Sequence, residues 1–376
     1  VNDFKKIKEE VINNNISLVF VGPEDPIVNG IYDFFKSDNS LKKIKIIAPS
    51  KLAGRLEGSK EFAKKFMERY NIPTAKHGTF TRDNIDQAYM FLDNMSSPYV
   101  LKADGLAGGK GVLIIHDLEE AKQELRSMIF DKKFGESSSK VVIEEFLDGI
   151  ELSCFVLTDG NNYKILPFAK DYKKIGEADT GLNTGGMGAI SPVVFLDDVF
   201  LEKIEERVIK PTINGIMKEN MEYMGIVFIG LIKVNEDPYV IEYNVRMGDP
   251  ETEVVFPRIE NDLLELFNSM GSTEFANIDL IVDERHAATV IMVSGGYPIN
   301  YEKNKVITGI ENITDSIVFH AGTKKDDNVF LTNGGRVLAI TSLAKNYKQA
   351  IVLSYKQIER ISFEKAYFRK DIGFDL

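Results

Sequence analysis

The chain has a single cysteine, fewer basic than acidic residues and no long apolar run, and each of these features excludes a class of protein. Its single cysteine, Cys154, excludes an intrachain disulfide framework and a thiolate metal cluster, so a reducing cytoplasm fits it best. The net charge of -11 argues against a general nucleic-acid surface, because phosphate binding needs a clustered positive field. Apolar runs such as Ile226 to Ile232 are shorter than the ~20 residues that span a bilayer, so we expect no membrane partner.

The composition predicts a soluble globular protein built from several units. Hydrophobic residues make up 44% of the chain and charged residues 27%. A length of 376 residues predicts two to four packed units. The chain starts at Val1, and residues 2–15 have helical spacing without the apolar centre of a signal sequence, so we expect a cut or processed front end.

The first residues alternate between helix and strand. A helix with Phe4, Ile7 and Val11 on one face precedes a buried strand from Ser17 to Gly22, and a helix (27–36) and a strand (45–48) follow. This is the pattern of a doubly wound α/β unit. No strand with a glycine-rich turn precedes the first helix, so we expect this unit to be incomplete. Glu24 lies in the turn after the first strand, where open α/β sheets place ligands.

A glycine-rich segment reads as strand, loop and strand over residues 99–103, 104–111 and 112–115. Gly108, Gly109 and Lys110 in this loop expose backbone N–H groups, which suits a phosphate cradle, although the spacing is not that of a P-loop. A flexible hairpin tip is the alternative. Lys102 lies inside the apolar strand, where an unpaired ammonium is costly, and this favours an anionic partner.

Residues 140–157 predict two strands joined by Asp148 and Gly149. The backbone groups of Glu145 to Leu147 can pair with an adenine edge, and Glu151 can accept from a ribose hydroxyl. An ordinary hairpin with a polar turn is the alternative.

The segment from Asp171 to Pro192 is rich in charge, glycine and small polar groups and shows little periodicity. Ordered domains seldom carry such a loop without a function, and disorder is the alternative. Its short polar side chains and open backbone positions are candidate substrate contacts: Asp179, Thr180, Asn183, Thr184, Gly185 and Gly186.

The stretch YVIEYNVRMGDPE carries the most chemistry. In a strand over 238–244, Glu242 and Asn244 project from one side, which we expect to be the side of Val240. A carboxylate beside an amide carbonyl can bind Mg²⁺. Arg246 then supplies an anion receptor, and Gly248 and Asp249 a flexible point and an acid. A polar surface strand end is the alternative.

The remaining residues predict a small α+β unit that ends in a helix over 347–361. Lys324 and Arg336 lie at predicted strand edges near glycines. They can hold a phosphate, or they are solvated edge charges.

Short motifs occur together and in one order along the chain: LEGSK, KADGLAGGKGV, VIEEFLDG, NTGGMGAISP, GDPETE, HAGTK and TNGGRVL. With VGPEDP near the front and FRKDIG near the end, they cover essentially the whole chain. The chain resembles the phosphoribosylamine-glycine ligases (GAR synthetases), which are ATP-grasp enzymes of purine biosynthesis.

The resemblance implies an α/β (α+β) chain with the ATP-grasp fold. The implied units are an incomplete N-terminal α/β domain (1–76), a lid subdomain (77–148), a central subdomain (149–275) and a C-terminal α+β domain (276–376). It also implies a cytoplasmic enzyme that is a monomer or a weak dimer.

The implied reaction forms glycyl phosphate from glycine and ATP, and the amine of 5-phosphoribosylamine then captures it. The implied cofactor is Mg²⁺ or Mn²⁺ with ATP. Another ATP-grasp carboxylate-amine ligase, or a nucleotide-binding but inactive fragment, are the alternatives.

The family's site residues transfer by position. The implied metal ligands are Glu242 and Asn244, and the implied catalytic residues are Arg246, Asp179 and Lys102. ATP contacts are implied for Lys102, Gly108, Gly109, Lys110, Glu144, Glu145, Phe146, Leu147 and Glu151. Substrate contacts are implied for Glu24, Asp179, Thr180, Asn183, Thr184, Gly185, Gly186, Arg246, Gly248, Asp249, Lys324 and Arg336.

The chain departs from the family pattern at three places. The strand and glycine-rich turn with which the family begins are missing. Tyr172 replaces the imidazole of the family's DHKR segment, which puts a proton-carrying role in doubt. Leu182 replaces a proline before Asn183, which is expected to loosen that loop.

Overall fold

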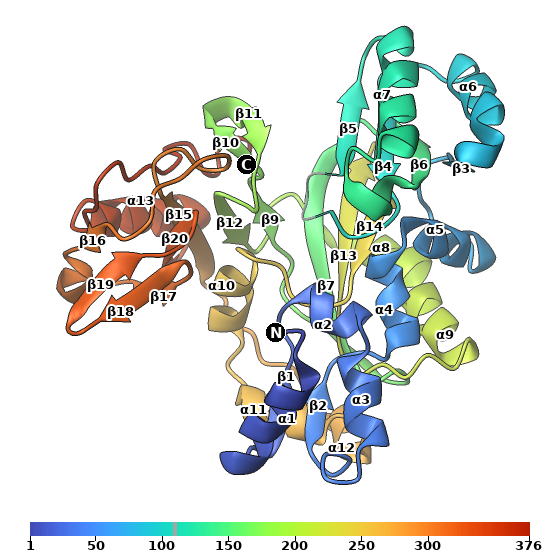
Figure 1. Ribbon diagram of the computed structural model, residues 1–376. Helices are drawn as coiled ribbons and strands as arrows, with labels where there is room; N and C mark the ends of the chain where they lie inside the picture. The colour runs from blue at the N-terminus through green and yellow to red at the C-terminus, as the bar shows by residue number, and fades with distance from the viewer. Residues whose placement is uncertain (108–110) are drawn as a thin grey trace.

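A computed structural model describes residues 1–107 and 111–376, so the predicted phosphate contacts Gly108, Gly109 and Lys110 lie outside the described residues (Figure 1). The chain forms an N-terminal unit, a lid, a central sheet and a C-terminal unit. Within these two ranges, no helix is both long and apolar enough to cross a membrane.

The N-terminal unit contains two parallel strands flanked by helices. Its elements are α1 (Phe4–Asn13), β1 (Leu18–Phe20), α2 (Glu24–Val28), α3 (Ile31–Ser37), β2 (Lys45–Ile47) and α4 (Lys51–Gly58). The prediction of one helix over 27–36 is wrong. The helix begins at Glu24 and is interrupted at Gly30, whose φ of 91° lies in the left-handed region that ends a right-handed helix.

The lid is an antiparallel sheet in the order β3-β6-β4-β5, with two helices on one face (Figure 1). The helix α5 (Lys60–Arg69) leads into it. Its elements are β3 (His77–Thr81), α6 (Ile85–Asp93), β4 (Tyr99–Ala103), β5 (Val112–Ile115), α7 (Leu118–Phe130) and β6 (Lys140–Glu145). Leu101, Leu125 and Ile143 belong to its own buried apolar cluster, so the lid has a core separate from that of the central sheet.

The central sheet has the order β14-β13-β7-β8. Its strands are β7 (Ile150–Thr158), β8 (Tyr163–Ile165), β13 (Gly225–Val234) and β14 (Asp237–Asn244), and α8 (Asp198–Ile204) and α9 (Lys210–Lys218) accompany it. The alternative of a hairpin around Asp148 and Gly149 is wrong. Strand β6 pairs with β3 and β4, whereas β7 pairs with β13 and β8, so residues 146–149 connect two sheets.

The C-terminal unit contains a five-stranded sheet, β17-β20-β15-β12-β9, and a three-stranded sheet, β16-β19-β18. The helix α13 (Tyr347–Ile358) packs on β15 and β20. The strands are β9 (Lys170–Asp171), β12 (Gly188–Ser191), β15 (His286–Val293), β16 (Val306–Ile307), β17 (Ile317–His320), β18 (Thr323–Asp326), β19 (Val329–Thr332) and β20 (Arg336–Ala344). The helices α10 (Thr252–Val255), α11 (Leu263–Ser269) and α12 (Thr273–Asn277) lie between the central sheet and this unit in sequence.

The glycine-rich segment 171–192 is ordered, against the alternative of a disordered loop. Its ends form β9 and β12 of the C-terminal sheet, and its middle forms the hairpin of β10 (Lys174–Gly176) and β11 (Thr180–Asn183). Pairing with β15, a distant strand, explains why local periodicity did not predict these strands.

Candidate active site

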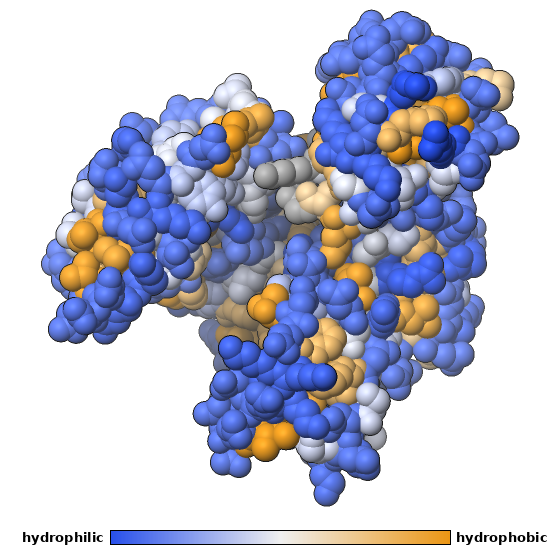
Figure 2. Space-filling model, in the orientation of Figure 1, coloured by the Kyte–Doolittle hydropathy of each residue, from blue (hydrophilic) through white to orange (hydrophobic). Residues whose placement is uncertain are grey.

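A cavity of about 740 Å³ lies where the N-terminal unit, the lid, the central sheet and the C-terminal unit meet. Figure 2 shows the molecule hollowed between the C-terminal unit and the other parts. The cavity gathers many of the predicted site residues: Glu24, Glu144, Thr184, Gly185, Glu242, Asn244, Arg246, Gly248, Asp249 and Arg336. Segments from every part of the chain therefore contribute to one site.

The predicted metal ligands lie on β14 and line this cavity. A β-bulge sets the direction of their side chains. On β13, Gly230 and Leu231 are consecutive, but they pair with Glu242 and Val240 on β14, so Ile241 is left as an extra residue. The prediction that Val240 shares their side is wrong. Val240 is fully buried in the central core together with Tyr243, because the extra residue Ile241 shifts the alternation by one.

These two residues fit a hard cation by their chemistry. Among the described residues, no group of three or more His, Cys, Asp or Glu side chains is placed to hold a metal ion. A carboxylate and an amide oxygen alone match the way Mg²⁺ is held when substrate phosphates and water supply its other ligands. Glu242 and Asn244 are neighbouring oxygen donors at the cavity that fit such an ion.

Two lysines contact the buried carboxylate of Glu144. The Nζ atoms of Lys64 and Lys102 each lie 3.0 Å from its Oε2 atom. Although burial opposes it, these two ammonium groups hold the pKa of Glu144 below its usual value. Within the described part of the chain, Oε1 of Glu144 has no hydrogen-bond partner. One carboxylate oxygen of Glu144, an expected ATP contact, is therefore paired with these lysines.

Sequence reasoning did not single out Lys60 and Lys64. Both line the cavity from the start of α5, one helical turn apart. Burial lowers the pKa of Lys60, and it lowers the pKa of Lys64 to about 8. Lysine side chains on a helix usually lie in solvent, so the only signal in the sequence was the LEGSK motif, whose last residue is Lys60, the first residue of α5.

The connection between the two sheets holds the residues expected at adenine. The N–H of Glu145 donates to the Lys76 carbonyl at 2.9 Å, so it is not available to a base. Phe146 is exposed in this connection. The carboxylate of Glu151, expected at ribose, lies 2.6 Å from the Nζ atom of Lys173, whose charge holds the pKa of Glu151 below its usual value.

Arg246 is held between two acids. Its Nε atom lies 3.3 Å from Glu24, and its Nη2 atom lies 3.0 Å from the buried Glu57. The other oxygen of Glu57 accepts from the N–H of Val245 at 2.7 Å. Burial raises the pKa of Glu57 to about 7. Glu57, which sequence reasoning missed, thus fixes both the side chain of Arg246 and the backbone before it.

Arg336 reaches the cavity from the C-terminal unit. Its Nη1 atom donates to the carbonyls of Gly185 and Asp249, both at 2.7 Å, and lies 2.9 Å from the Asp249 carboxylate. The N–H of Gly185 donates to the hydroxyl of Tyr297 at 3.0 Å. The C-terminal unit therefore fixes the glycine loop against the loop that follows β14.

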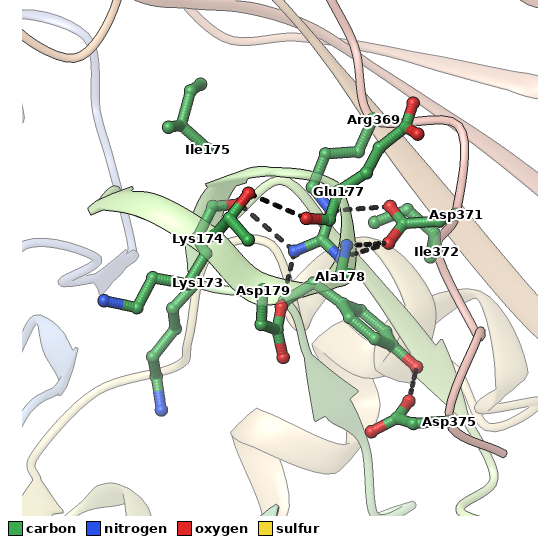
Figure 3. Close-up of polar contacts among 12 residues, drawn as sticks. Lys173, Lys174, Ile175, Glu177, Ala178, Asp179, Arg369, Asp371, Ile372 and Asp375 are labelled. Atoms are coloured by element: carbon green, nitrogen blue, oxygen red, sulfur yellow. Dashed lines mark hydrogen bonds and ion pairs between the residues drawn. The ribbon is translucent and has the colours of Figure 1, made fainter.

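Several predicted contacts lie elsewhere. Asp179 pairs with Arg369 at 2.6 Å and is not among the residues that line the cavity (Figure 3). Thr180 and Asn183 are exposed on β11, and Lys324 is exposed on β18 in the outer three-stranded sheet (Figure 1). Gly186 is not among the residues that line the cavity, and a Cβ atom there would meet Pro250 at 2.3 Å.

The two positions at which a residue differs from the family pattern, Tyr172 and Leu182, have different surroundings. Tyr172 is buried, and its hydroxyl donates to Asp375 at 2.8 Å, so it does not reach the cavity as a proton carrier would have to. Leu182 is half exposed on β11. Neither residue lines the cavity.

Glu253 is a further acid at the cavity. Burial raises its pKa to about 7, and its Oε2 atom has no hydrogen-bond partner among the described residues. The neighbouring Glu251, whose pKa burial also raises to about 7, accepts from the hydroxyl of Ser153 at 2.9 Å. Both carboxyl groups stay largely neutral below pH 7.

Three models of one family together match almost the whole chain. They describe the N domain (residues 1–57), the ATP-grasp (A) domain (58–252) and the C domain (287–375) of phosphoribosylglycinamide synthetase. The chain belongs to the phosphoribosylglycinamide synthetase family. This confirms the family and the ATP-grasp fold that the sequence motifs indicate.

Two phosphoribosylamine–glycine ligases are similar to this chain over nearly all of its residues. The phosphoribosylamine–glycine ligase of Fusobacterium nucleatum is 43% identical over 98% of this chain and 87% of its own. That of Caldanaerobacter subterraneus is 42% identical over 99% of this chain and 88% of its own.

Solved structures agree on the fold. The crystal structure of phosphoribosylamine–glycine ligase from Thermotoga maritima has a TM-score of 0.84 and 34% identity, and it covers 96% of this chain and 88% of its own. The biotin carboxylase domain of Hydrogenobacter thermophilus 2-oxoglutarate carboxylase, solved with MgADP, has a TM-score of 0.72 at 17% identity, over 97% of this chain and 79% of its own. At that identity the likeness shows the fold alone.

Proposed function

We propose that this protein joins glycine to 5-phosphoribosylamine in purine biosynthesis, converting ATP to ADP and phosphate through glycyl phosphate. The observation that carries the proposal is that Lys60 and Lys64, the Glu242/Asn244 pair and Arg246 line one cavity. Because no covalent enzyme intermediate is needed, the protein acts by positioning and by neutralising charge.

The lysine end of the cavity holds the triphosphate. Lys64 and Lys102 share one carboxylate, Glu144, and Lys60 donates to the Gly105 carbonyl, so positive charge remains for an anion in a site where water screens it poorly. Lys102 contacts the α- and β-phosphates, and the segment around Gly108 to Lys110 is assigned to the phosphates by the family motif alone. Phe146 and Leu147 border the adenine, and Glu151 turns from Lys173 to the ribose.

Glu242 and Asn244 hold Mg²⁺ or Mn²⁺ beside the phosphates. The ion supplies charge neutralisation at the transferred phosphoryl group. The bulge at Ile241 keeps both oxygen donors on the cavity side, while Tyr243 anchors the strand in the core.

Arg246 binds the carboxylate of the amino acid. Its two acidic partners hold the guanidinium in place, and it lines the cavity together with Gly248 and Thr184.

The amine substrate approaches from the side of Glu24 and Arg336. These residues come from the N-terminal and C-terminal units and face the same cavity. The guanidinium of Arg336 is suited to a phosphate, since Arg binds phosphate with two parallel hydrogen bonds. Asp179 and Lys324, which lie outside the cavity, are not part of this assignment.

The test is phosphate release from ATP with each substrate left out in turn. We expect release that requires both glycine and 5-phosphoribosylamine, and glycinamide ribonucleotide as the product. Equal turnover without glycine, or with another amino acid in its place, would favour a different carboxylate-amine ligase. Binding of ATP with no product would indicate a nucleotide-binding protein without catalysis.

A further inference from the structure

Arg369 is a fully buried cation outside the cavity. It lies in the tail that follows α13 and has no exposed surface. Its guanidinium carbon lies 5.4 Å from the ring centre of Tyr172 and 5.7 Å from that of Phe374. A buried charge is costly unless it is paired and hydrogen-bonded, so its partners indicate what it holds.

The guanidinium joins the tail to the β10–β11 hairpin. Two of its nitrogens contact the two oxygens of Asp371, both at 2.8 Å, in the fork geometry that fixes both groups. The third, Nη1, donates to Asp179 at 2.6 Å and to the carbonyl of Lys174 at 3.2 Å. Asp371 in turn accepts from the N–H of Ala178 at 2.7 Å (Figure 3).

The turn held by these contacts has an unfavourable backbone. Ala178 and Asp179 both have φ of 51°, in the left-handed region that residues other than glycine seldom adopt. Two such residues in succession persist only where the surroundings impose them. The Arg369–Asp371 pair, which contacts both residues, supplies that constraint.

The same hairpin ends at the cavity. After β11, the N–H and the hydroxyl of Thr184 both donate to the carbonyl of Lys173, each at 2.8 Å, and close the base of the hairpin. The next residue, Gly185, lines the cavity and contacts Arg336. The hairpin thus runs from the turn held by Arg369 directly into the loop that Arg336 and Tyr297 contact at the cavity.

We propose that Arg369 is a positioning residue, which with Asp371 clamps the β10–β11 turn so that Thr184 and Gly185 keep their place beside the amino-acid substrate. The inference rests on the proposed function for the identity of that substrate. It also gives Asp179 a role as an anchor of the clamp, in place of the substrate contact that the motif resemblance implied.

The test compares Arg369→Lys, which keeps the charge but loses the fork, with Asp371→Asn, which keeps the shape but loses the charge. Lys370→Ala is the matched control, because Lys370 lies between them in the chain and is exposed. The first measurement is the rate at which a lysine-specific protease cuts after Lys173 and Lys174. We expect about a tenfold faster cut in both clamp variants and no change in the control.

The second measurement separates substrate positioning from general damage. We expect the KM for glycine to rise about tenfold in both clamp variants, while the dissociation constant for ATP measured without glycine changes less than threefold. A variant that only weakens the fold would change both constants together. If Arg369→Lys does not fold, the cleavage rate and the KM for glycine of Asp371→Asn alone test whether the clamp positions the loop.

Unchanged cleavage in both variants would overturn the clamp. Faster cleavage with an unchanged KM for glycine would overturn the positioning role. The unsubstituted protein separates these outcomes from failure of the proposed function. If it releases no phosphate in response to glycine, the function itself is wrong, whereas the cleavage rates still report whether Arg369 holds the hairpin.

Discussion

At the scale of single residues, burial sets the charge of the site. The cavity places Lys60 and Lys64, whose pKa values burial lowers, near acids such as Glu57 and Glu253, whose pKa values it raises. Glu242 lines the same cavity as the carboxylate of the proposed metal pair. Two predictions follow from individual carboxylates in this environment.

Replacing Glu242 with Gln removes the anionic metal ligand and keeps the size of the side chain. We expect Mg²⁺-dependent turnover to fall at least about a hundredfold, which corresponds to about 2.7 kcal/mol, with an unchanged fold by circular dichroism. Glu236→Gln, in the exposed turn before the same strand, is the control. Turnover that survives in Glu242→Gln would contradict the metal assignment.

Replacing Glu253 with Gln changes the pH dependence of stability. Burial raises the pKa of Glu253 from 4.5 to about 7, so the folded state holds a proton that the unfolded state releases between these pH values. Stability therefore falls as pH rises from 4.5 to 7 and is constant above. Because Gln cannot ionise, we expect this loss to shrink by about 1–3 kcal/mol between pH 5 and pH 8.

The measurement is urea unfolding of both proteins at the two pH values. Glu265→Gln, at an exposed position on α11, serves as the control, and we expect it to change stability by less than about 0.5 kcal/mol. Identical pH dependence in Glu253→Gln and the unsubstituted protein would show that Glu253 is already ionised in the fold.

At the scale of elements, the connection between the lid sheet and the central sheet is tightly packed. A Cβ atom on Gly149 would lie 2.2 Å from the carbonyl oxygen of Lys233 on β13. Gly149→Ala thus forces the connection to move, and we expect the free energy of unfolding to fall by about 1–3 kcal/mol. We also expect weaker ATP binding, since this connection borders the proposed adenine site.

Gly22→Ala is the control for stability alone, because no atom lies within 4 Å of a Cβ placed there, and the unsubstituted protein is the reference for nucleotide binding, since Gly22 lines the cavity. Denaturant unfolding measures the stability of both variants, and equilibrium dialysis measures nucleotide binding. If Gly149→Ala is as stable as Gly22→Ala, the contact with Lys233 does not constrain the connection.

Elements with strong local periodicity could be predicted from the sequence, and long-range pairing could not. The predicted strands over 99–103 and 112–115 are present as β4 and β5. The strands β6 and β7 pair with strands far away in the chain, β4 and β13, and not with each other as the hairpin alternative required. The bulge at Ile241 escaped prediction for the same reason.

The site shows the same division. The motif around Glu242 placed two oxygen donors and Arg246 together, and the structure brings all three to one cavity. The resemblance to the family implied a substrate contact for Asp179, whereas in the structure Asp179 pairs with Arg369 in the distant tail. Because the two residues are 190 positions apart, no local sequence pattern predicts their contact.

At the scale of the whole molecule, the cavity exists because four parts of the chain converge on it. Glu24 comes from the N-terminal unit, Glu144 from the lid, Asn244 from the central sheet and Arg336 from the C-terminal unit. The chain as a whole carries a net charge of -11, so Lys60 and Lys64 form a local concentration of positive charge at the cavity, as the proposed triphosphate site requires.

The most direct test is a crystal structure with a non-hydrolysable ATP analogue, glycine and Mn²⁺, with manganese located by its anomalous scattering. We predict manganese about 2–2.3 Å from a carboxylate oxygen of Glu242 and the amide oxygen of Asn244. We also predict phosphates against Lys102 and the glycine carboxylate on Arg246. Manganese bound elsewhere, with Glu242 and Asn244 empty and glycine away from Arg246, would contradict the account.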